Sequence, residues 1–367
     1  MNIRNLVARF IAAAVLVVSS TGAFAQVTPA EGFTPPDDTP TYRVGAVIYG
    51  DYTYIASPTT KDTDGNTIHS SSFNIARAYL NLTGSVNHFI TFRVTPDIAR
   101  ETGTGSSLAG SQTFRLKYAF AQVALDDWTT HGSWVRVGVQ QTPFVDYSEG
   151  IYRYRWQGTV FAEREGFITS SDAAISGHWN IPNGYGDFHG GFYNGEGYSK
   201  AEANNEKAIQ FRASVRPLPL GGVWRGLRLT GFLVDDHYVE GAKRQRTIGQ
   251  ITYEHPLVNA GIELLSAKDR TSITKAEVDA KGYSIWATPK LGDKGWELLL
   301  RHDQLTPNKS INSQKRKRDI AGLAYWLPNL NKLSAAVMLD RDSLKQSGFT
   351  PVRVNDTRYG LKMLLIF

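Results

Sequence analysis

The last ten residues, Arg358 to Phe367 (RYGLKMLLIF), are the stretch that decides the fold. Every second side chain there is apolar or aromatic: Tyr359, Leu361, Met363, Leu365 and Phe367. Charged Arg358 and Lys362 occupy the other face. One apolar face with aromatic ends is typical of a membrane barrel strand, which has lipid outside and water inside. An edge strand of a soluble β-sandwich alternates in a similar way, so the pattern must recur elsewhere to be decisive.

The alternation does recur along the chain. About sixteen segments have the length of roughly ten residues that a tilted membrane strand needs. The expected strands are 41–55, 72–84, 87–97, 113–124, 133–142, 172–181, 185–194, 207–217, 225–235, 245–255, 257–267, 281–290, 294–303, 316–327, 332–341 and 356–367. The sequence therefore predicts an all-β protein, a transmembrane antiparallel β-barrel. A barrel of this size encloses an aqueous channel, whereas about eight strands would be filled by side chains.

The connections between these segments alternate in length. Short ones include 85–86, 182–184 and 255–256, and long ones include 56–71 and 98–112. Tight periplasmic turns and longer outer loops are the usual arrangement of an outer-membrane barrel, and an even strand number puts both termini on the periplasmic side.

One hairpin can be predicted at the level of single residues. Asn183-Gly184 is a strong signal for a two-residue turn. It would pair apolar with apolar and polar with polar side chains, as register requires. The expected pairs are Trp179 with Phe188, Ile175 with Phe192, His178 with His189, and Asn180 with Asp187.

The first 25 residues have the features of a secretory signal peptide. Arg4 and Arg9 are basic, residues 10–18 are apolar, and Ala23-Phe24-Ala25 forms a cleavage site. Residues 26–40, rich in Pro and Thr, are expected to be a periplasmic leader, and 41–367 the barrel. The predicted location is the bacterial outer membrane.

The composition excludes several classes of protein. Hydrophobic residues make up 41% and charged residues 20% of the 367 residues, which is too balanced for a disordered chain. There is no Cys, so disulfide scaffolds and cysteine-ligated metals are excluded. The net charge of +6 says little about partners. No hydrolase, P-loop or zinc-protease motif is present, so we expect no enzyme activity, no cofactor and no nucleic-acid partner.

The third outer loop, 143–171, is long and both charged and aromatic. Long ordered loops are usually functional, so we expect this one to fold into the barrel and narrow the pore; the alternative is that it lies on the rim. The candidate pore-lining and anion-binding residues are Arg77, Arg93, Arg115, Lys117 and Arg136 on the wall and Arg153, Arg155 and Arg164 on the loop. Arginine can bind phosphate oxygens with two hydrogen bonds and stays charged at any relevant pH. The acidic residues Asp146, Glu149, Glu163 and Glu165 would temper this charge.

The sequence resembles the phosphate-selective porin O and P family over nearly the whole mature chain. The segments that carry the resemblance are RAYLN at 77–81, FRVTPD at 92–97, RLKYA at 115–119, VQQTP at 139–143, EGIYRYR at 149–155 and YNGEG at 193–197. The resemblance implies a sixteen-stranded, usually trimeric channel that passes phosphate or polyphosphate along a ladder of Arg and Lys. Arg115, Lys117 and Arg136 occupy plausible ladder positions.

Other interpretations stay open at this point. Tyr152, Tyr154 and Trp156 would suit a porin for sugars or other neutral solutes, and a barrel enzyme is a third possibility. His178 with His189 is a weak candidate for metal binding, and the loop beginning at Asp62 is a weak calcium candidate because Phe73 replaces the required Glu. The run 315–318 (KRKR) is expected to meet lipopolysaccharide phosphates or the pore mouth.

Overall fold

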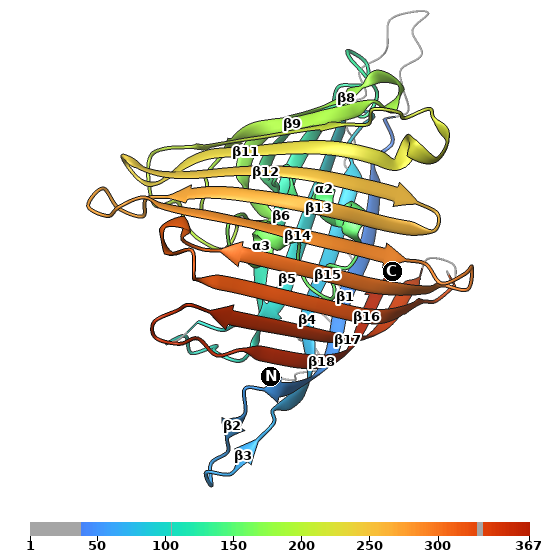
Figure 1. The fold of residues 1–367 in the computed structure, drawn as a ribbon. Coiled ribbons are helices and arrows are strands. Elements are labelled where there is room, and N and C mark those ends of the chain that lie inside the picture. Colours follow the sequence, from blue (N-terminus) through green and yellow to red (C-terminus); the bar gives the residue numbers. More distant parts are fainter. Residues whose placement is uncertain (1–37, 104, 329–332) are drawn as a thin grey trace, which may run out of the picture. The chain divides into compact units, whose positions relative to one another are not determined.

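The computed structural model describes residues 38–103, 105–328 and 333–367. Within these ranges, sixteen antiparallel strands close into a barrel, in which the first strand pairs with the last (Figure 1). The barrel confirms the predicted fold class. The expected signal peptide, and all but the end of the expected leader, lie outside the described residues.

Each expected segment corresponds to one barrel strand. The strands are β1 Thr41–Ser57, β4 Ser71–Ser85, β5 Ile90–Arg100, β6 Gln112–Ala124, β7 Trp134–Gln141, β8 Ser171–Ile181, β9 Gly186–Tyr193, β10 Ala208–Val215, β11 Leu227–Val239, β12 Ala242–His255, β13 Val258–Asp269, β14 Val278–Pro289, β15 Trp296–Thr306, β16 Lys315–Trp326, β17 Ser334–Ser347 and β18 Asp356–Ile366. A small hairpin, β2 Thr60–Lys61 with β3 Thr67–Ile68, forms in the first long loop.

The expected sorting of loop lengths holds only in part. Strands β11 and β12 extend well beyond their predicted ends, so residues 240–241 alone separate them. Asp236 pairs with Arg244 across these tips, and the two side chains form an ion pair. These charged pairs lengthen the hydrogen-bonded ladder between β11 and β12. Because the charged residues do not alternate with apolar ones, the sequence pattern did not predict the ends of these two strands. At the opposite end of the barrel, the turn 216–226 is longer than the expected 218–224, and the turn 125–133 is long as well, close to the expected 125–132.

The hairpin between β8 and β9 has the predicted register. Trp179 pairs with Phe188, Ile175 with Phe192, His178 with His189, and Asn180 with Asp187. Asn183 and Gly184 both have positive φ, at 60° and 74°, which is the backbone conformation that an Asn-Gly hairpin turn requires.

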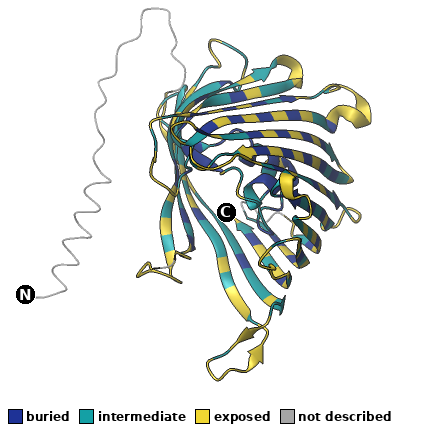
Figure 2. Cartoon of the chain, turned by 60° about the vertical axis from the view of Figure 1, so that its left-hand side comes forward, coloured by how far each residue is buried: buried dark blue, intermediate teal, exposed yellow. Residues whose placement is uncertain are grey.

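The two faces of the wall differ as predicted, with one exception. Outward side chains are mostly apolar and exposed, and Figure 2 shows the alternation as dark and yellow bands along the strands. The inward face is mainly polar. However, one inward sector is apolar and buried; it consists of Trp286, Leu299, Ile320, Met338 and Leu364. This sector carries the third loop.

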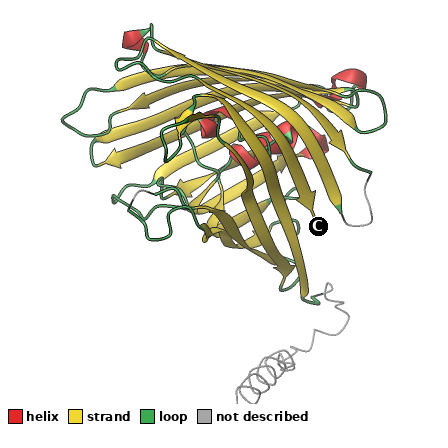
Figure 3. Cartoon of the chain, turned by 90° about the horizontal axis from the view of Figure 1, so that it is seen from below, coloured by secondary structure: helices red, strands yellow, loops and turns green. Residues whose placement is uncertain are grey.

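The third loop, 142–170, folds into the barrel. It contains the helices α2 Val145–Tyr152 and α3 Phe161–Arg164, which Figure 3 shows enclosed by the strands. Asp146 lies in the first turn of α2, where an acidic side chain is favourable, and Arg153 ends the helix with φ of 64°. The alternative position on the rim is therefore wrong. No helix in the described ranges is long and apolar enough to cross a membrane.

A glycine on β7 allows the backbone geometry of the barrel wall to be tested directly. Gly138 has φ of 120°, and a Cβ there would lie 2.3 Å from the Ala119 carbonyl oxygen. We expect Gly138→Ala to cost about 1–3 kcal/mol from backbone strain alone. Urea unfolding of the folded barrel in detergent would measure this as a lower midpoint.

The matched control for this change is Gly231→Ala. Gly231 is exposed in the middle of β11, and nothing lies within 4 Å of the position that its Cβ would occupy. Its midpoint should stay at the wild-type value. Equal midpoints for the two variants would contradict the assigned strain at Gly138.

Candidate functional site

The third loop is fixed to one half of the barrel, from β10 to β17. The Tyr147 hydroxyl lies 3.1 Å from the Thr230 hydroxyl, and the Ala162 amide donates a 3.0 Å hydrogen bond to Glu263. Further along the wall, the Gln157 amide donates to Asp340 at 3.1 Å. These contacts hold the loop on one side. On the other side a cavity separates much of the loop from the wall of β1 and β4–β6, and the Tyr118–Asp146 hydrogen bond crosses between them.

Apolar packing reinforces this attachment in two clusters. The first joins Val145, Ile151, Tyr152, Tyr154, Trp156 and Val160 of the loop to the apolar sector of the wall. The second joins Phe144, Phe161 and Ala162 to Phe232, Val234, Ile248, Leu265 and Leu305. Burying each large side chain stabilises the docked loop by about 1.5–3 kcal/mol. The loop is thus a packed part of the core.

Glu297 is the polar centre of the first cluster. Its carboxylate is 2% exposed and accepts hydrogen bonds from Arg153 at 2.5 Å and from the hydroxyl of Tyr154 at 2.8 Å. The indole nitrogen of Trp326 donates a third bond at 2.8 Å. A buried carboxylate needs such partners to offset the loss of water.

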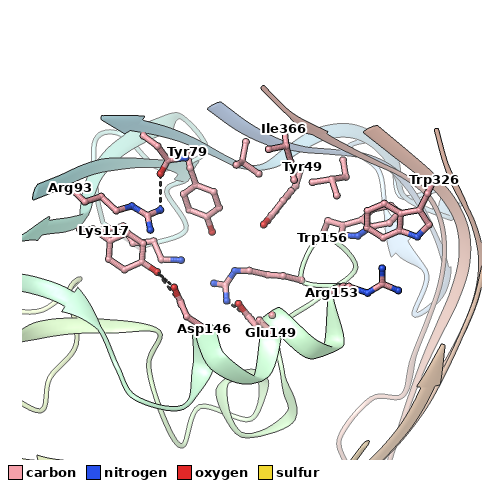
Figure 4. A pocket seen from close by; sticks show the side chains of 16 residues that line it. Tyr49, Tyr79, Arg93, Lys117, Asp146, Glu149, Arg153, Trp156, Trp326 and Ile366 are labelled. Carbon is pink, nitrogen blue, oxygen red and sulfur yellow. Dashed lines mark hydrogen bonds and ion pairs between the residues drawn. The ribbon is translucent and has the colours of Figure 1, made fainter. Parts of the chain in front are cut away.

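A cavity of about 420 Å³ lies between the loop and the wall of β1, β4–β6, β16 and β18 (Figure 4). Arg93 and Lys117 reach it from the wall, and Arg153 and Arg155 from the loop. Four of the eight predicted site residues therefore meet at one place.

A β-bulge directs two consecutive side chains of β6 inward. The register between β5 and β6 shifts so that Thr95 pairs with Tyr118 but Pro96 pairs with Leu116, which leaves Lys117 as the extra residue. Both Lys117, 3% exposed, and Tyr118 line the cavity. Bulges commonly redirect side chains next to functional sites.

Aromatic rings hold three of the wall cations in place. Lys117 Nζ is 4.6 Å from the ring centre of Tyr79, and the Arg93 guanidinium is 4.5 Å from that of Tyr118. Outside the cavity, Arg136 lies 3.7 Å from the ring centre of Trp134. Among the described residues, none of the three cations has a carboxylate within ion-pair distance. A ring face attracts a cation without neutralising it, so these charges remain available to a mobile anion.

The remaining candidate cations are compensated or lie elsewhere. Arg77 and Arg115 share the carboxylate of Asp97 and do not line the cavity. Arg153 pairs with Glu297, and Arg155 pairs with Glu149 and Glu163. Arg164 lies away from the cavity and donates to Gln157 at 2.9 Å.

Several residues of the site were not predicted. The Tyr118 hydroxyl donates to Asp146 on α2 at 3.0 Å, and Tyr49, Trp326 and Ile366 complete the cavity lining. The alternation showed that Glu297 faces the lumen, but its partner Arg153 is too distant in the sequence for any local pattern to reveal. The inward apolar residues were a usable signal, because they break the alternation where the loop packs.

The weaker sequence candidates have structural roles. Tyr152 and Tyr154 are buried in the loop, at 1% and 0% exposure, so of the proposed sugar-binding aromatics Trp156 alone lines the cavity. His178 binds Asp187 at 3.1 Å, and the described residues contain no group of three or more potential metal ligands. The Asp62 carboxylate accepts bonds from Asp64 and Asn66 within its own turn.

The basic run 315–318 divides between the two faces of β16. Arg316 binds Glu165 at 2.9 Å and Arg318 binds Asp342 at 2.7 Å, both inside the barrel. Lys317 is exposed on the outer face and pairs in register with exposed Lys345. The run is therefore no single basic patch.

Comparison with known proteins places the fold among outer-membrane channels. No family model and no curated protein matches the sequence. Among solved structures, OmpF of Salmonella typhi in complex with daunomycin has a TM-score of 0.60 at 11% identity, covering 89% of this chain and 97% of that one. The outer membrane channel DcaP of Acinetobacter baumannii has a TM-score of 0.58 at 9% identity, with coverages of 89% and 97%.

A third similar structure is OmpT, an outer membrane protein of Vibrio cholerae, in its trimer form. Its TM-score is 0.56 at 11% identity, and the match covers 89% of this chain and 100% of that one. Likeness at such low identity establishes the porin-like barrel fold. The resemblance to phosphate-selective porins remains an expectation.

Proposed function

We propose that the chain is an outer-membrane porin that lets small hydrophilic solutes diffuse passively and prefers anions. The observation that carries the anion preference is the set of three wall cations, Arg93, Lys117 and Arg136, that rest on aromatic rings instead of carboxylates. Conduction needs several modest sites, because one tight site would trap the ion. Spaced cations held by rings meet this requirement.

Phosphate belongs to this proposal as a permeant anion. Arg93 donates to Asn81 at 2.8 Å and to Thr95 at 2.9 Å, which fixes its guanidinium near the ring of Tyr118. A guanidinium fixed in this way can offer paired N–H groups to phosphate oxygens. Sugar-permeable and enzymatic barrels are the competing functions that the experiment below separates.

The location and partners follow from the same proposal. The apolar outer face would contact lipid, and residues 1–25 would direct export and be removed. Exposed Lys317 and Lys345 would meet lipopolysaccharide phosphates. A homotrimer is the proposed assembly, in keeping with the trimer form of the similar Vibrio cholerae barrel.

A planar-bilayer measurement tests the function. The refolded chain is reconstituted across a potassium chloride gradient, and the reversal potential is read before and after phosphate is added. Stable conductance with an anion-side reversal is expected, and phosphate should reduce the chloride current. A cation-side reversal would remove the anion preference, and folded protein without channels would remove the porin and favour the enzyme.

The anion preference is expected to depend on pH through Glu149. Burial in the loop raises the pKa of Glu149 to about 7, with Glu163 and Asp146 adding to the rise and Arg155 opposing it. Lowering the pH from 8 to 6 therefore neutralises one negative charge at the cavity. The anion-to-cation permeability ratio should rise over this range.

The control for this effect is Glu149→Gln. This variant carries no titrating carboxyl at the position, so it should show the low-pH permeability ratio at both pH 6 and pH 8. An unchanged pH step in the variant would assign the effect to other groups and contradict this prediction.

A further inference from the structure

The cavity between the third loop and the wall has two unlike sides. Figure 4 shows Arg93 and Lys117 on one side and Trp156 and Trp326 on the other, with Ile366 between them along the wall. Part of the second side serves to pack the loop, because Trp156 is 5% exposed and belongs to the first cluster. The arrangement suits a solute that is itself charged at one end and apolar at the other.

The cationic side is ready to receive a carboxylate. Lys117 makes no hydrogen bond or ion pair with any described residue, and its Nζ points into the cavity (Figure 4). Arg93 uses two of its three nitrogens on Asn81 and Thr95. An anion at this side would meet an ammonium and a guanidinium that have no carboxylate within ion-pair distance, although Asp146 also lines the cavity.

The opposite side offers apolar surface, and the cation there, Arg153, lies over the ring of Trp326 and is paired with Glu297. Val47 and Ile366 are paired in register on β1 and β18, and both line the cavity. Trp156 and Trp326 meet edge to face at a centroid distance of 6.1 Å. Loop packing accounts for Leu364, which is 4% exposed, but leaves Ile366 39% exposed. Covering apolar surface that would otherwise face water in the lumen lowers the free energy.

We propose that this cavity preferentially binds organic anions with an apolar or aromatic body, such as aromatic carboxylates, over inorganic phosphate. The carboxylate lies at Lys117 and Arg93, and the ring lies against Val47, Ile366 and the two Trp side chains. Inorganic phosphate can make the contact with Lys117 and Arg93, but it has no apolar part that could cover the apolar side of the cavity. A volume of about 420 Å³ is within the usual range for small-molecule sites. This inference rests on the proposed function.

The test compares three anions on the full refolded chain in a planar bilayer. Benzoate, acetate and inorganic phosphate are added in turn at constant ionic strength, and the block of the chloride current is measured. Half-block by benzoate is expected at a concentration at least fivefold below those of acetate and phosphate. Equal potency of benzoate and acetate, or stronger block by phosphate, overturns the proposal.

Substitutions on the apolar side of the cavity test whether that side causes the preference for benzoate. Val47→Thr combined with Ile366→Thr keeps β-branched side chains on both strands and should reduce the fivefold advantage to twofold or less. Val47→Thr alone serves where the pair folds poorly. Val137→Thr makes the same change on the outward face of β7, where Val137 is 54% exposed, and should keep the full advantage. An undiminished benzoate advantage in the cavity variants also overturns the proposal.

The chloride measurement made beforehand separates the two proposals. Absence of channels, or a cation-side reversal in chloride alone, overturns the porin or its anion preference before any organic anion is added. Normal anion-selective conductance with no preference for benzoate overturns the cavity assignment alone.

Discussion

Reversing the charge at Lys117 with Lys117→Glu is expected to abolish the anion preference of the channel. Lys117 projects into the cavity from a bulge, and no described carboxylate neutralises it. The change removes one positive charge and adds one negative charge where solutes must pass. The reversal potential in a chloride gradient should move toward the cation side.

The size of the effect follows from Coulomb energy in a wet pore. A unit charge acts on an ion about 4 Å away with about 1 kcal/mol in bulk water, and more where water is restricted. A change of two units is then worth roughly 2 kcal/mol for a monovalent anion, or about a thirtyfold fall in anion permeability. Lys117→Gln should produce about half of this change in free energy.

Lys268→Glu is the matched control. Lys268 is exposed on the outer face at the end of β13, where it pairs with Glu277 at 3.5 Å. Its reversal changes the net charge by the same amount but lies outside the lumen, so the reversal potential should stay near the wild-type value. Equal shifts in the two variants would mean that net charge, and not the cavity, sets selectivity.

Removing the Glu297 carboxylate is expected to release the third loop from the wall. Glu297→Ala leaves Arg153, Tyr154 and Trp326 without their common acceptor. Glu297 is buried but Arg153 is 32% exposed, so we expect a cost of about 1–3 kcal/mol, below the roughly 3–5 kcal/mol of a fully buried pair. The barrel should remain closed, because its strand ladders do not depend on this contact, while the loop detaches.

Two measurements report the detached loop. Single-channel conductance should increase and become noisier, and trypsin should cleave after Arg153 or Arg155 in the folded protein. Glu277→Ala is the control, since Glu277 pairs with Lys268, which lies on the outer face of the barrel. A Glu297→Ala protein with wild-type conductance and an intact loop would show that apolar packing alone holds the loop.

The strands could be predicted because their signals are local. Alternation of period two and an Asn-Gly turn fixed the register of β8 and β9 down to single pairs. The tips of β11 and β12 were missed because Asp236 and Arg244 are both charged, and their pairing becomes visible only across the hairpin. Local pattern recognises strands with one apolar face better than strands with two polar faces.

The sequence predicted which cationic residues would form the site, but not which other side chains surround them or how they are held. The positions of Arg93, Lys117, Arg153 and Arg155 at one cavity agree with a loop that enters the barrel. Strict alternation, however, would place Tyr118 on the outer face, and only the bulge at Lys117 brings it inside. The hydrogen bonds that Tyr147, Ala162 and Gln157 of the loop make with the wall join residues 83, 101 and 183 positions apart, so no local spacing rule could reveal them.

The attachment of the loop to one half of the barrel divides the circumference into two arcs under different selection. Substitutions along β10–β17 act on loop packing and so change stability, whereas substitutions on β4–β6 would change the surface that a solute meets. The solute-facing arc can therefore acquire new specificities by single exchanges while the loop-bearing arc keeps the scaffold intact. Such a separation would let the barrel change its solute preference without losing its fold.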